Sequence, residues 1–252
     1  GDGADPLASL APPASEWPLG EPDLVLTLPA FDVPATGVVN YQHPTVANPL
    51  TEAVWVRAVA IAPGDVSDAT AAADMVKAIE AQLGAIDILV NNAGISPYFK
   101  RVEHVTVEDF DAVVDVNMRG TYFASVEAAK RMFETGGGCI VNVTSVTGIV
   151  PVERQGVYAA TKAAVHQLTK VMALEWADRK VRVNAIAPGW VNTELTGSLL
   201  ESRHGEGLLA DIPMGRAATP DDIGGTAVWL ASDAARYVTG SIVVVDGGRQ
   251  LR

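Results

Sequence analysis

The chain has 252 residues, of which 48% are apolar and 19% are charged. This composition is typical of a folded globular protein and excludes a wholly disordered chain. The net charge of −12 repels phosphate backbones, so we expect no nucleic-acid partner. The sequence contains no run of about 18 consecutive apolar residues, which predicts no membrane partner.

Cysteine and histidine content limits the chemistry further. The single cysteine, Cys139, excludes an intramolecular disulfide and a zinc site built from cysteines. The histidines are scattered along the chain, so we expect no metal site, and we expect His166 to lie on a helix at a subunit contact. The first residues contain no basic segment followed by an apolar one, which favours a cytoplasmic protein over a secreted one.

The first 65 residues differ from the rest of the chain. They hold ten of the fifteen prolines and carry a net charge of −7, whereas the following 187 residues carry −5. Short apolar runs at 23–28, 36–41 and 53–61 alternate with Pro and Gly, a pattern typical of strands and turns. We therefore predict an atypical, proline-rich and β-leaning N-terminal segment at 1–64, consisting of an arm and short strands, and a separate domain at 65–252.

From residue 65 onward, helical and strand patterns alternate. Apolar residues at helical spacing predict helices, and short, largely apolar runs predict buried parallel strands. Alternating strands and helices imply parallel crossover connections, so the fold class is α/β, a single-domain Rossmann-like doubly wound parallel sheet. The helices are expected at about 67–83, 106–133, 156–177 and 220–231, and the strands at 86–90, 139–143, 181–187 and 241–245.

Three segments follow predicted strands, at the edge where such sheets bind ligands. The first contains Asn91, Asn92, Ala93 and Gly94, whose small residues allow close backbone approach, although a tight turn explains them equally well. The second ends at Ser145, whose hydroxyl could serve as a helix cap or as a catalytic group. The third runs from Pro188 and Gly189 to Thr193, which could contact an amide or a phosphate.

Tyr158 and Lys162 provide the decisive pattern. Residues four apart share one face of a helix, so the ammonium is expected beside the phenol. A neighbouring positive charge favours the phenolate, which would bring a tyrosine with an ordinary pKa of about 10 closer to neutrality as a proton donor or acceptor. The pair alone is weak evidence, because chance produces this spacing in roughly one chain in eight of such composition. The surrounding motifs give it weight.

With those motifs, residues from about 65 to 252 resemble the short-chain dehydrogenase/reductase family of NAD(P)-dependent oxidoreductases. The overall sequence pattern most resembles that of 3-oxoacyl reductases and of sugar or alcohol dehydrogenases. The motifs do not distinguish between these groups of enzymes. The matching residues are Asp65 with Val66, Asn91 to Gly94, Asn117, Ser145, Tyr158 with Lys162, Pro188 with Gly189 and Thr193, and Val245 to Gly248.

The resemblance implies a role for each catalytic residue. Tyr158 would be the general acid for carbonyl reduction or the base for alcohol oxidation, and Ser145 would hold the substrate oxygen. Lys162 would lower the pKa of Tyr158 and bind the nicotinamide ribose, while Asn117 would support a proton relay through water. The substrate would be a small carbonyl or alcohol, and the protein a homodimer or homotetramer packed through the helices at 106–133 and 156–177.

The resemblance also implies a site for NAD or NADP, the source or acceptor of the hydride. Asp65, Val66 and Asn91 would line the adenosine side, and the bend from Pro188 to Thr193 would lie by the nicotinamide. The full set of expected cofactor-binding residues is Asp65, Val66, Asn91, Ala93, Gly94, Tyr158, Lys162, Pro188, Gly189, Val191 and Thr193.

One family feature is missing from the first 65 residues: a glycine-rich turn between a strand and a helix that would cradle the pyrophosphate. The family's second strand, which supplies the acidic or basic residue that distinguishes NAD from NADP, is missing as well, so the choice between the two cofactors is open. The absence also favours an alternative, a non-catalytic and cofactor-free remnant or chimera that acts at most as an interaction module. Residues 17–64 resemble, over a short match, secreted copper type II monooxygenase-like proteins, but their metal ligands are not present. We expect an apolar run at 23–28 or 54–61 to pair with the strand at 86–90 or its neighbour.

Overall fold

The computed structural model describes residues 69–193, 196–202 and 205–252, which all belong to one compact unit of the chain, Ala62–Arg252. The predicted N-terminal strands, the boundary near residue 64, and Asp65 and Val66 lie outside the described residues and stay predictions. Among the described helices, none is both long enough and apolar enough to cross a lipid bilayer.

The described strands form one parallel sheet. In chain order and in spatial order they are β1 (Ile88–Asn91), β2 (Gly138–Val143), β3 (Val181–Pro188) and β4 (Ile242–Val245). Every neighbouring pair is parallel, as predicted, and each boundary lies within two residues of its expected place. β1 is an edge strand of the sheet formed by the described residues, and the segments expected to pair with it lie outside them.

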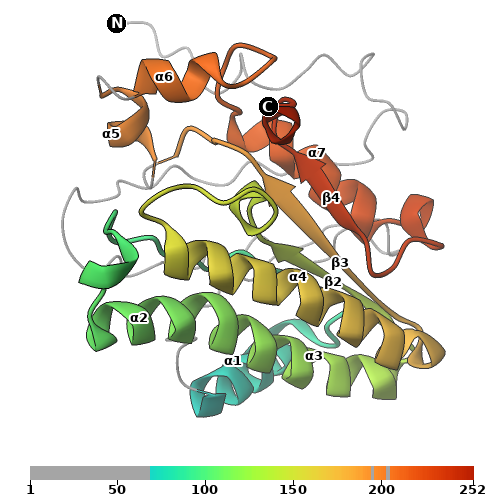
Figure 1. The fold of residues 1–252 in the computed structure, drawn as a ribbon. Helices are drawn as coiled ribbons and strands as arrows, with labels where there is room; N and C mark the ends of the chain where they lie inside the picture. The colour runs from blue at the N-terminus through green and yellow to red at the C-terminus, as the bar shows by residue number, and fades with distance from the viewer. Residues whose placement is uncertain (1–68, 194–195, 203–204) are drawn as a thin grey trace, which may run out of the picture. The chain divides into compact units, whose positions relative to one another are not determined.

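One face of the sheet is covered by α3 (Thr121–Thr135) and α4 (Gly156–Trp176), which run side by side along the strands in Figure 1. Fully buried Ile140 of β2 packs on this face with Met132 of α3 and Met172 of α4.

The opposite face is covered by α7 (Pro220–Ala231). Successive strand residues point to opposite sides, so Cys139 and Val141 pack here with Leu230 of α7. Helices on both faces confirm the predicted doubly wound, Rossmann-like α/β fold.

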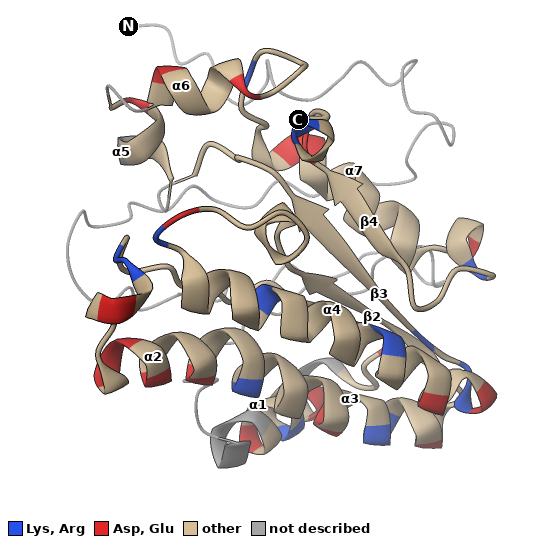
Figure 2. Ribbon diagram, in the orientation of Figure 1, with Lys and Arg blue, Asp and Glu red and all other residues tan. Residues whose placement is uncertain are grey.

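Charge distribution follows from this burial. β1, β2 and β4 contain no charged residue, and β3 contains only Arg182. Figure 2 shows the charged residues gathered instead on the helices and the connecting segments. One ion pair joins two helices, between Arg131 Nε of α3 and Glu80 Oε2 of α1 (Ala69–Leu83) at 3.2 Å.

The segment predicted as one helix at 106–133 is interrupted. It consists of α2 (Val107–Val114), a π-helical turn (Asp115–Gly120) and α3. The Thr121 hydroxyl donates to the carbonyl of Asn117 at 3.0 Å, which gives the widened turn an additional hydrogen bond. Single π turns inside helices often occur at functional sites, and apolar periodicity does not reveal them.

Between β3 and α7 the sequence pattern predicts neither a helix nor a strand. The structure instead contains two short helices, α5 (Gly197–Leu200) and α6 (Gly205–Ala210), beyond the carboxyl end of β3 in Figure 1. Both are too short for hydrophobic periodicity to predict them. Five single 3₁₀ turns complete the described elements: Val102–His104, Val146–Gly148, Ala177–Arg179, Asp233–Ala235 and Arg249–Leu251.

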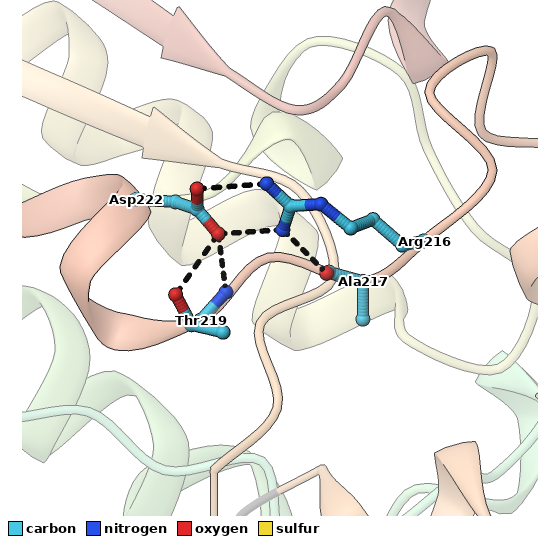
Figure 3. Close-up of polar contacts among 4 residues, drawn as sticks. All are labelled: Arg216, Ala217, Thr219 and Asp222. Carbon is cyan, nitrogen blue, oxygen red and sulfur yellow. Dashed lines mark hydrogen bonds and ion pairs between the residues drawn. The ribbon is translucent and has the colours of Figure 1, made fainter.

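The start of α7 is fixed by the contacts in Figure 3. Arg216 donates to both carboxylate oxygens of Asp222, at 2.6 and 2.9 Å, and Asp222 accepts the Thr219 amide at 2.7 Å. Arg216 and these hydrogen bonds hold the pKa of Asp222 well below its ordinary value. The adjoining Ala218 exchanges backbone hydrogen bonds with Trp190 and Asn192, so this capping box anchors the segment after β3.

Candidate active site

Ser145 follows β2 and caps the 3₁₀ turn Val146–Gly148. Its hydroxyl oxygen accepts from the Thr147 amide at 3.2 Å and from the Thr147 hydroxyl at 2.9 Å. Because both bonds use Ser145 as the acceptor, its own hydrogen can be donated to a ligand. A Cβ at Gly148 would lie 2.8 Å from the backbone of Ala163, so glycine is required for this turn to contact α4.

Tyr158 and Lys162 lie on the same face of α4, as predicted. The Lys162 ammonium lies 5.6 Å from the centroid of the Tyr158 ring, within range of a cation–π interaction. It donates to the carbonyl of Val143, the last residue of β2, at 3.1 Å. That carbonyl is its one hydrogen-bond partner among the described residues, so the remaining ammonium hydrogens are available to a ligand.

Burial shifts the pKa of both residues. It lowers the pKa of Lys162 to about 8, because the charged ammonium has lost most of its hydration. Burial raises the pKa of Tyr158, and the Ser145 hydroxyl opposes that rise. Desolvation of the phenol outweighs the lowering by Ser145, so the net direction is opposite to the one expected from the sequence. The expected contribution of Lys162 to this pKa stays a prediction.

Asn117 lies on the π turn and is fully buried. Its amide pairs with the backbone of Ile95 in both directions: the Ile95 N–H donates to Oδ1 at 2.8 Å, and Nδ2 donates to the Ile95 carbonyl at 2.9 Å. Asn117 therefore holds the segment after β1 against the helices. Its expected part in a proton relay stays a prediction.

Gly94 lies directly in front of the Lys162 ammonium. A Cβ at this position would stand 3.1 Å from Lys162 Nζ and 3.5 Å from Asn117 Oδ1, so glycine keeps this space open. Open space beside unpaired ammonium hydrogens fits the hydroxyl-rich ribose next to a nicotinamide. The described residues therefore fit the nicotinamide half of NAD or NADP.

Asn91, at the end of β1, takes part in the hydrogen bonding of the sheet. Its Nδ2 donates to the Ser125 hydroxyl and to Asn142 Oδ1, both at 2.8 Å. Ala93 is exposed in the segment that follows. Their contacts with the adenosine side stay predictions, as do those of Asp65 and Val66.

The third predicted segment begins where β3 ends. Pro188 is opposite Val245 of β4, and the Gly189 amide donates to the Val245 carbonyl at 3.0 Å. Val191 forms an isolated bridge with Ala218. Thr193 is exposed, and its hydroxyl lies 3.2 Å from that of Thr196. The structure thus brings Gly189 to the site and leaves Thr193 at its periphery.

A pocket at the carboxyl ends of the strands joins these segments. Ser145 and Gly189, from two of the three segments predicted to follow strands, line it together with Tyr158 of α4, whereas no residue of 91–94 does. The complete lining is Ser96, Phe99, Ser145, Val146, Thr147, Gln155, Tyr158, Gly189, Trp190, Thr196, Leu199 and Arg249. The sequence prediction missed Ser96, Thr147, Gln155 and Arg249. Arg249 directly follows the Asp246-Gly247-Gly248 turn, and Gln155 precedes the Tyr158 helix, so only proximity to a motif could have indicated them.

His166 lies on α4 and is buried, and its Nε2 is 2.8 Å from the Thr144 hydroxyl, which itself donates to the Ile186 carbonyl at 2.7 Å. Apolar surroundings lower the pKa of His166, and nearby lysines add to the effect. The histidine is therefore buried within its own chain and positions the residue before Ser145. Its expected place at a subunit contact stays a prediction. In the part of the chain that the structure describes, no group of three or more His, Cys, Asp or Glu side chains could hold a metal ion.

Comparison with known proteins agrees with this geometry. The sequence model of a family described as enoyl-(acyl carrier protein) reductase matches residues 35–250. D-Threitol dehydrogenase of Mycolicibacterium smegmatis is 40% identical over 75% of this chain and 72% of its own length. A 3-oxoacyl-[acyl-carrier-protein] reductase of Thermotoga maritima is 40% identical over 73% of this chain and 74% of its own.

A solved structure of a dehydrogenase is also similar to this chain. Gluconate 5-dehydrogenase from Burkholderia cenocepacia, crystallised in complex with NADP and tartrate, superposes with a TM-score of 0.72 at 35% identity. The match covers 75% of this chain and 74% of that one.

Proposed function

The chain belongs to the short-chain dehydrogenase/reductase family of NAD(P)-dependent oxidoreductases, and from that premise we propose that Tyr158, Ser145, Lys162 and Asn117 carry its reaction. The reaction interconverts a small alcohol and the corresponding carbonyl compound. The observation that carries the proposed roles is that the Ser145 hydroxyl and the Tyr158 phenol line one pocket, with the Lys162 ammonium behind the phenol.

The residues of the pocket handle the proton and the substrate oxygen. Ser145 donates its hydrogen to that oxygen, because its acceptor positions are already used by Thr147. During oxidation the Tyr158 phenolate takes the hydroxyl proton while the carbinol C–H bond breaks; during reduction the phenol returns a proton to the carbonyl oxygen. When bound, the nicotinamide cofactor accepts or supplies the hydride that balances this transfer.

Lys162 has two roles in this scheme. Its position by the Tyr158 ring stabilises the negative charge that forms on the phenolate during oxidation. Its available ammonium hydrogens bind the ribose hydroxyls next to the nicotinamide, in the space left by Gly94. Asn117 positions that segment through Ile95 and contributes to the relay that removes the proton.

The remaining cofactor contacts are also proposals. Asp65, Val66 and Asn91 bind the adenosine side, Ala93 and Gly94 follow the ribose, and the bend from Pro188 through Val191 to Thr193 lies beside the nicotinamide. The cofactor is NAD or NADP, and titration of each one decides between them.

Two substrate types are represented among the relatives: hydroxylated small molecules and 3-oxoacyl thioesters. The pocket favours the first type, because Ser96, Gln155 and Arg249 offer polar groups that a hydrocarbon acyl chain would leave without partners. We therefore place a small hydroxylated alcohol or ketone first and a 3-oxoacyl thioester second.

The protein is further proposed to act in the cytoplasm as a homodimer or homotetramer. Apolar side chains on the helices expected at the subunit contact support the assembly. Leu174 of α4 is 82% exposed, and Phe110 and Tyr122 are exposed on α2 and α3. Burying them against a second copy would remove apolar surface from water.

Cofactor binding is the direct test of this scheme. We expect NADH or NADPH fluorescence to change on titration with micromolar affinity, and Lys162→Ala to abolish that binding. Lys170→Ala, on the same helix but exposed, is the matched control and should bind like the unaltered protein. No binding of either cofactor at millimolar concentration would instead support the non-catalytic interaction module.

A further inference from the structure

Unpartnered buried polar atoms are concentrated in the pocket. Among the described residues, four buried side-chain N or O atoms lack a hydrogen-bond partner, and three of them belong to residues that line it: Ser96 Oγ, Gln155 Oε1 and Arg249 Nε. The fourth, Arg131 Nε, faces the Glu80 carboxylate in the ion pair between α1 and α3. Buried polar groups are nearly always satisfied, so this cluster indicates that a ligand supplies the partners.

Gln155 shows that the arrangement does not serve the stability of the fold. It occupies the N-cap position of α4, where a side chain ordinarily accepts from the first turn of the helix. The Gln155 side chain makes no such cap hydrogen bond. It is only 5% exposed, so bulk water does not readily replace that bond. Its amide oxygen, which can only accept, therefore requires a donor such as a hydroxyl group.

Arg249 requires the opposite kind of partner. Its guanidinium can only donate, carries a permanent positive charge, and matches the two oxygens of a carboxylate. In a chain with a net charge of −12, it forms no ion pair with any described carboxylate. An anionic ligand would supply the missing counter-charge.

The backbone around Arg249 is fixed. The carboxylate of Asp246 accepts the amides of Gly248 and Gln250, at 2.8 and 2.7 Å. A Cβ at Gly247 would lie 2.7 Å from Ile212, so the turn packs closely on the segment after α6. Arg249 is therefore presented to the pocket by a rigid turn.

We propose that the substrate is a small hydroxycarboxylic acid, or the keto acid formed from it, whose carboxylate binds Arg249 and one of whose hydroxyl groups donates to Gln155. Ser96, which can donate and accept, binds a further hydroxyl. This inference rests on the proposed function, since the reacting hydroxyl must meet Ser145 and Tyr158, which line the same pocket.

A matched pair of four-carbon compounds tests it. Threitol is a neutral polyol, and threonate carries a carboxylate in place of one terminal CH₂OH group. We expect kcat/KM for threonate to exceed that for threitol, and Arg249→Met to reduce the acid-to-polyol ratio by roughly 30- to 1,000-fold. Arg249→Lys keeps the charge without the planar fork and should give an intermediate ratio. Arg252→Met, at an exposed position, is the control and should leave the ratio unchanged.

A binding measurement separates this inference from the proposed function. Tartrate is titrated calorimetrically into the unaltered protein, Arg249→Met and Arg252→Met, with circular dichroism confirming that each variant is folded. Weaker binding to Arg249→Met alone supports the carboxylate site, whether or not any alcohol is oxidised. Equal affinity for all three proteins, or an equal acid-to-polyol ratio, overturns it. Failure to oxidise either compound with NAD or NADP, alongside Arg249-dependent tartrate binding, counts against the proposed function alone.

Discussion

Two asparagines inside the sheet and Gln155 at the pocket are similarly buried, but their hydrogen bonding differs. Asn184 of β3 donates to the Val238 carbonyl at 2.9 Å and accepts the Ser241 amide at 3.1 Å. Asn142 of β2 likewise has a partner at each end of its amide. Gln155, an amide of the same chemistry, leaves its oxygen without a partner.

The difference separates polar groups that build the fold from polar groups that bind a ligand. A buried amide with both ends paired adds to stability and fixes the position of neighbouring strands. A buried group that lacks a partner costs free energy, and a protein retains it where a ligand provides the compensation. The predictions below test that distinction at single residues, beginning with the largest effect.

Replacing Tyr158 by Phe removes the proton donor and acceptor without emptying its place in the pocket. We expect kcat to fall by about 10²- to 10⁴-fold, the range attributed to general acid–base catalysis, with cofactor affinity retained. Steady-state kinetics and fluorescence titration measure the two quantities. Tyr237→Phe alters a fully exposed tyrosine and is the control. Retention of full activity in Tyr158→Phe would contradict the assigned role.

The direction of the reaction should respond to pH. Burial raises the pKa of Tyr158, so in the free protein the phenol is protonated at neutral pH, the form that reduction needs. For oxidation, kcat/KM should rise about tenfold per pH unit between roughly pH 6 and pH 8, as the phenolate becomes populated. The rise should flatten above pH 8, where Lys162 loses its proton. Oxidation that does not vary with pH would exclude Tyr158 as the base.

Lys162 should lower the stability of the fold while it serves the site. Its pKa is 10.5 in an ordinary environment and about 8 in the folded protein, so the unfolded chain binds the proton more tightly. The cost to stability is therefore complete below about pH 8 and disappears above about pH 10.5. Lys162→Met should raise the free energy of unfolding at pH 7 by up to roughly 3 kcal/mol, and by little at pH 10.5. Urea denaturation of both proteins at pH 7 and pH 10.5 measures the change in the free energy of unfolding. An equal increase at the two pH values would contradict a cost that comes from the buried charge of Lys162.

Asn184 is a buried amide whose nitrogen and oxygen both have hydrogen-bond partners. Asn184→Ala leaves the Val238 carbonyl and the Ser241 amide without their partner, and we expect it to cost about 2 to 3 kcal/mol of unfolding free energy. Denaturation compared with Asn192→Ala, at an exposed position, measures the loss. If Asn184→Ala and Asn192→Ala have similar free energies of unfolding, the paired amide of Asn184 does not stabilise the fold.

Gln155 is a buried amide whose oxygen has no hydrogen-bond partner among the described residues, and its replacement should change stability least. Gln155→Leu replaces a buried amide that has no partner for its oxygen, so stability should stay unchanged or rise by up to about 1 kcal/mol. Gln167→Leu, on the exposed face of α4, is the matched control. A loss of more than about 1 kcal/mol for Gln155→Leu would show that Gln155 supports the fold, and the ligand-binding interpretation would then be wrong.

Much of the described fold could be predicted because the signals are local. Apolar runs and helical periodicity located the four strands of the sheet, and Tyr158 and Lys162 share a helix face simply because they are four residues apart. The π turn at Asn117 was missed, since a single widened turn changes the periodicity too little. The pKa direction of Tyr158 was also missed, because burial is not visible in the spacing of two residues.

By itself, then, the sequence determined the alternation of strands and helices and the residues able to perform proton transfer. Only the tertiary structure decided which other residues lie in the pocket beside those proton-transfer residues. Ser96 follows the first described strand and Arg249 follows the last, yet the parallel sheet brings the carboxyl ends of both strands to one edge. The physical reason is that local chemistry depends on residue type and spacing, whereas a pocket depends on contacts between segments that are distant in sequence.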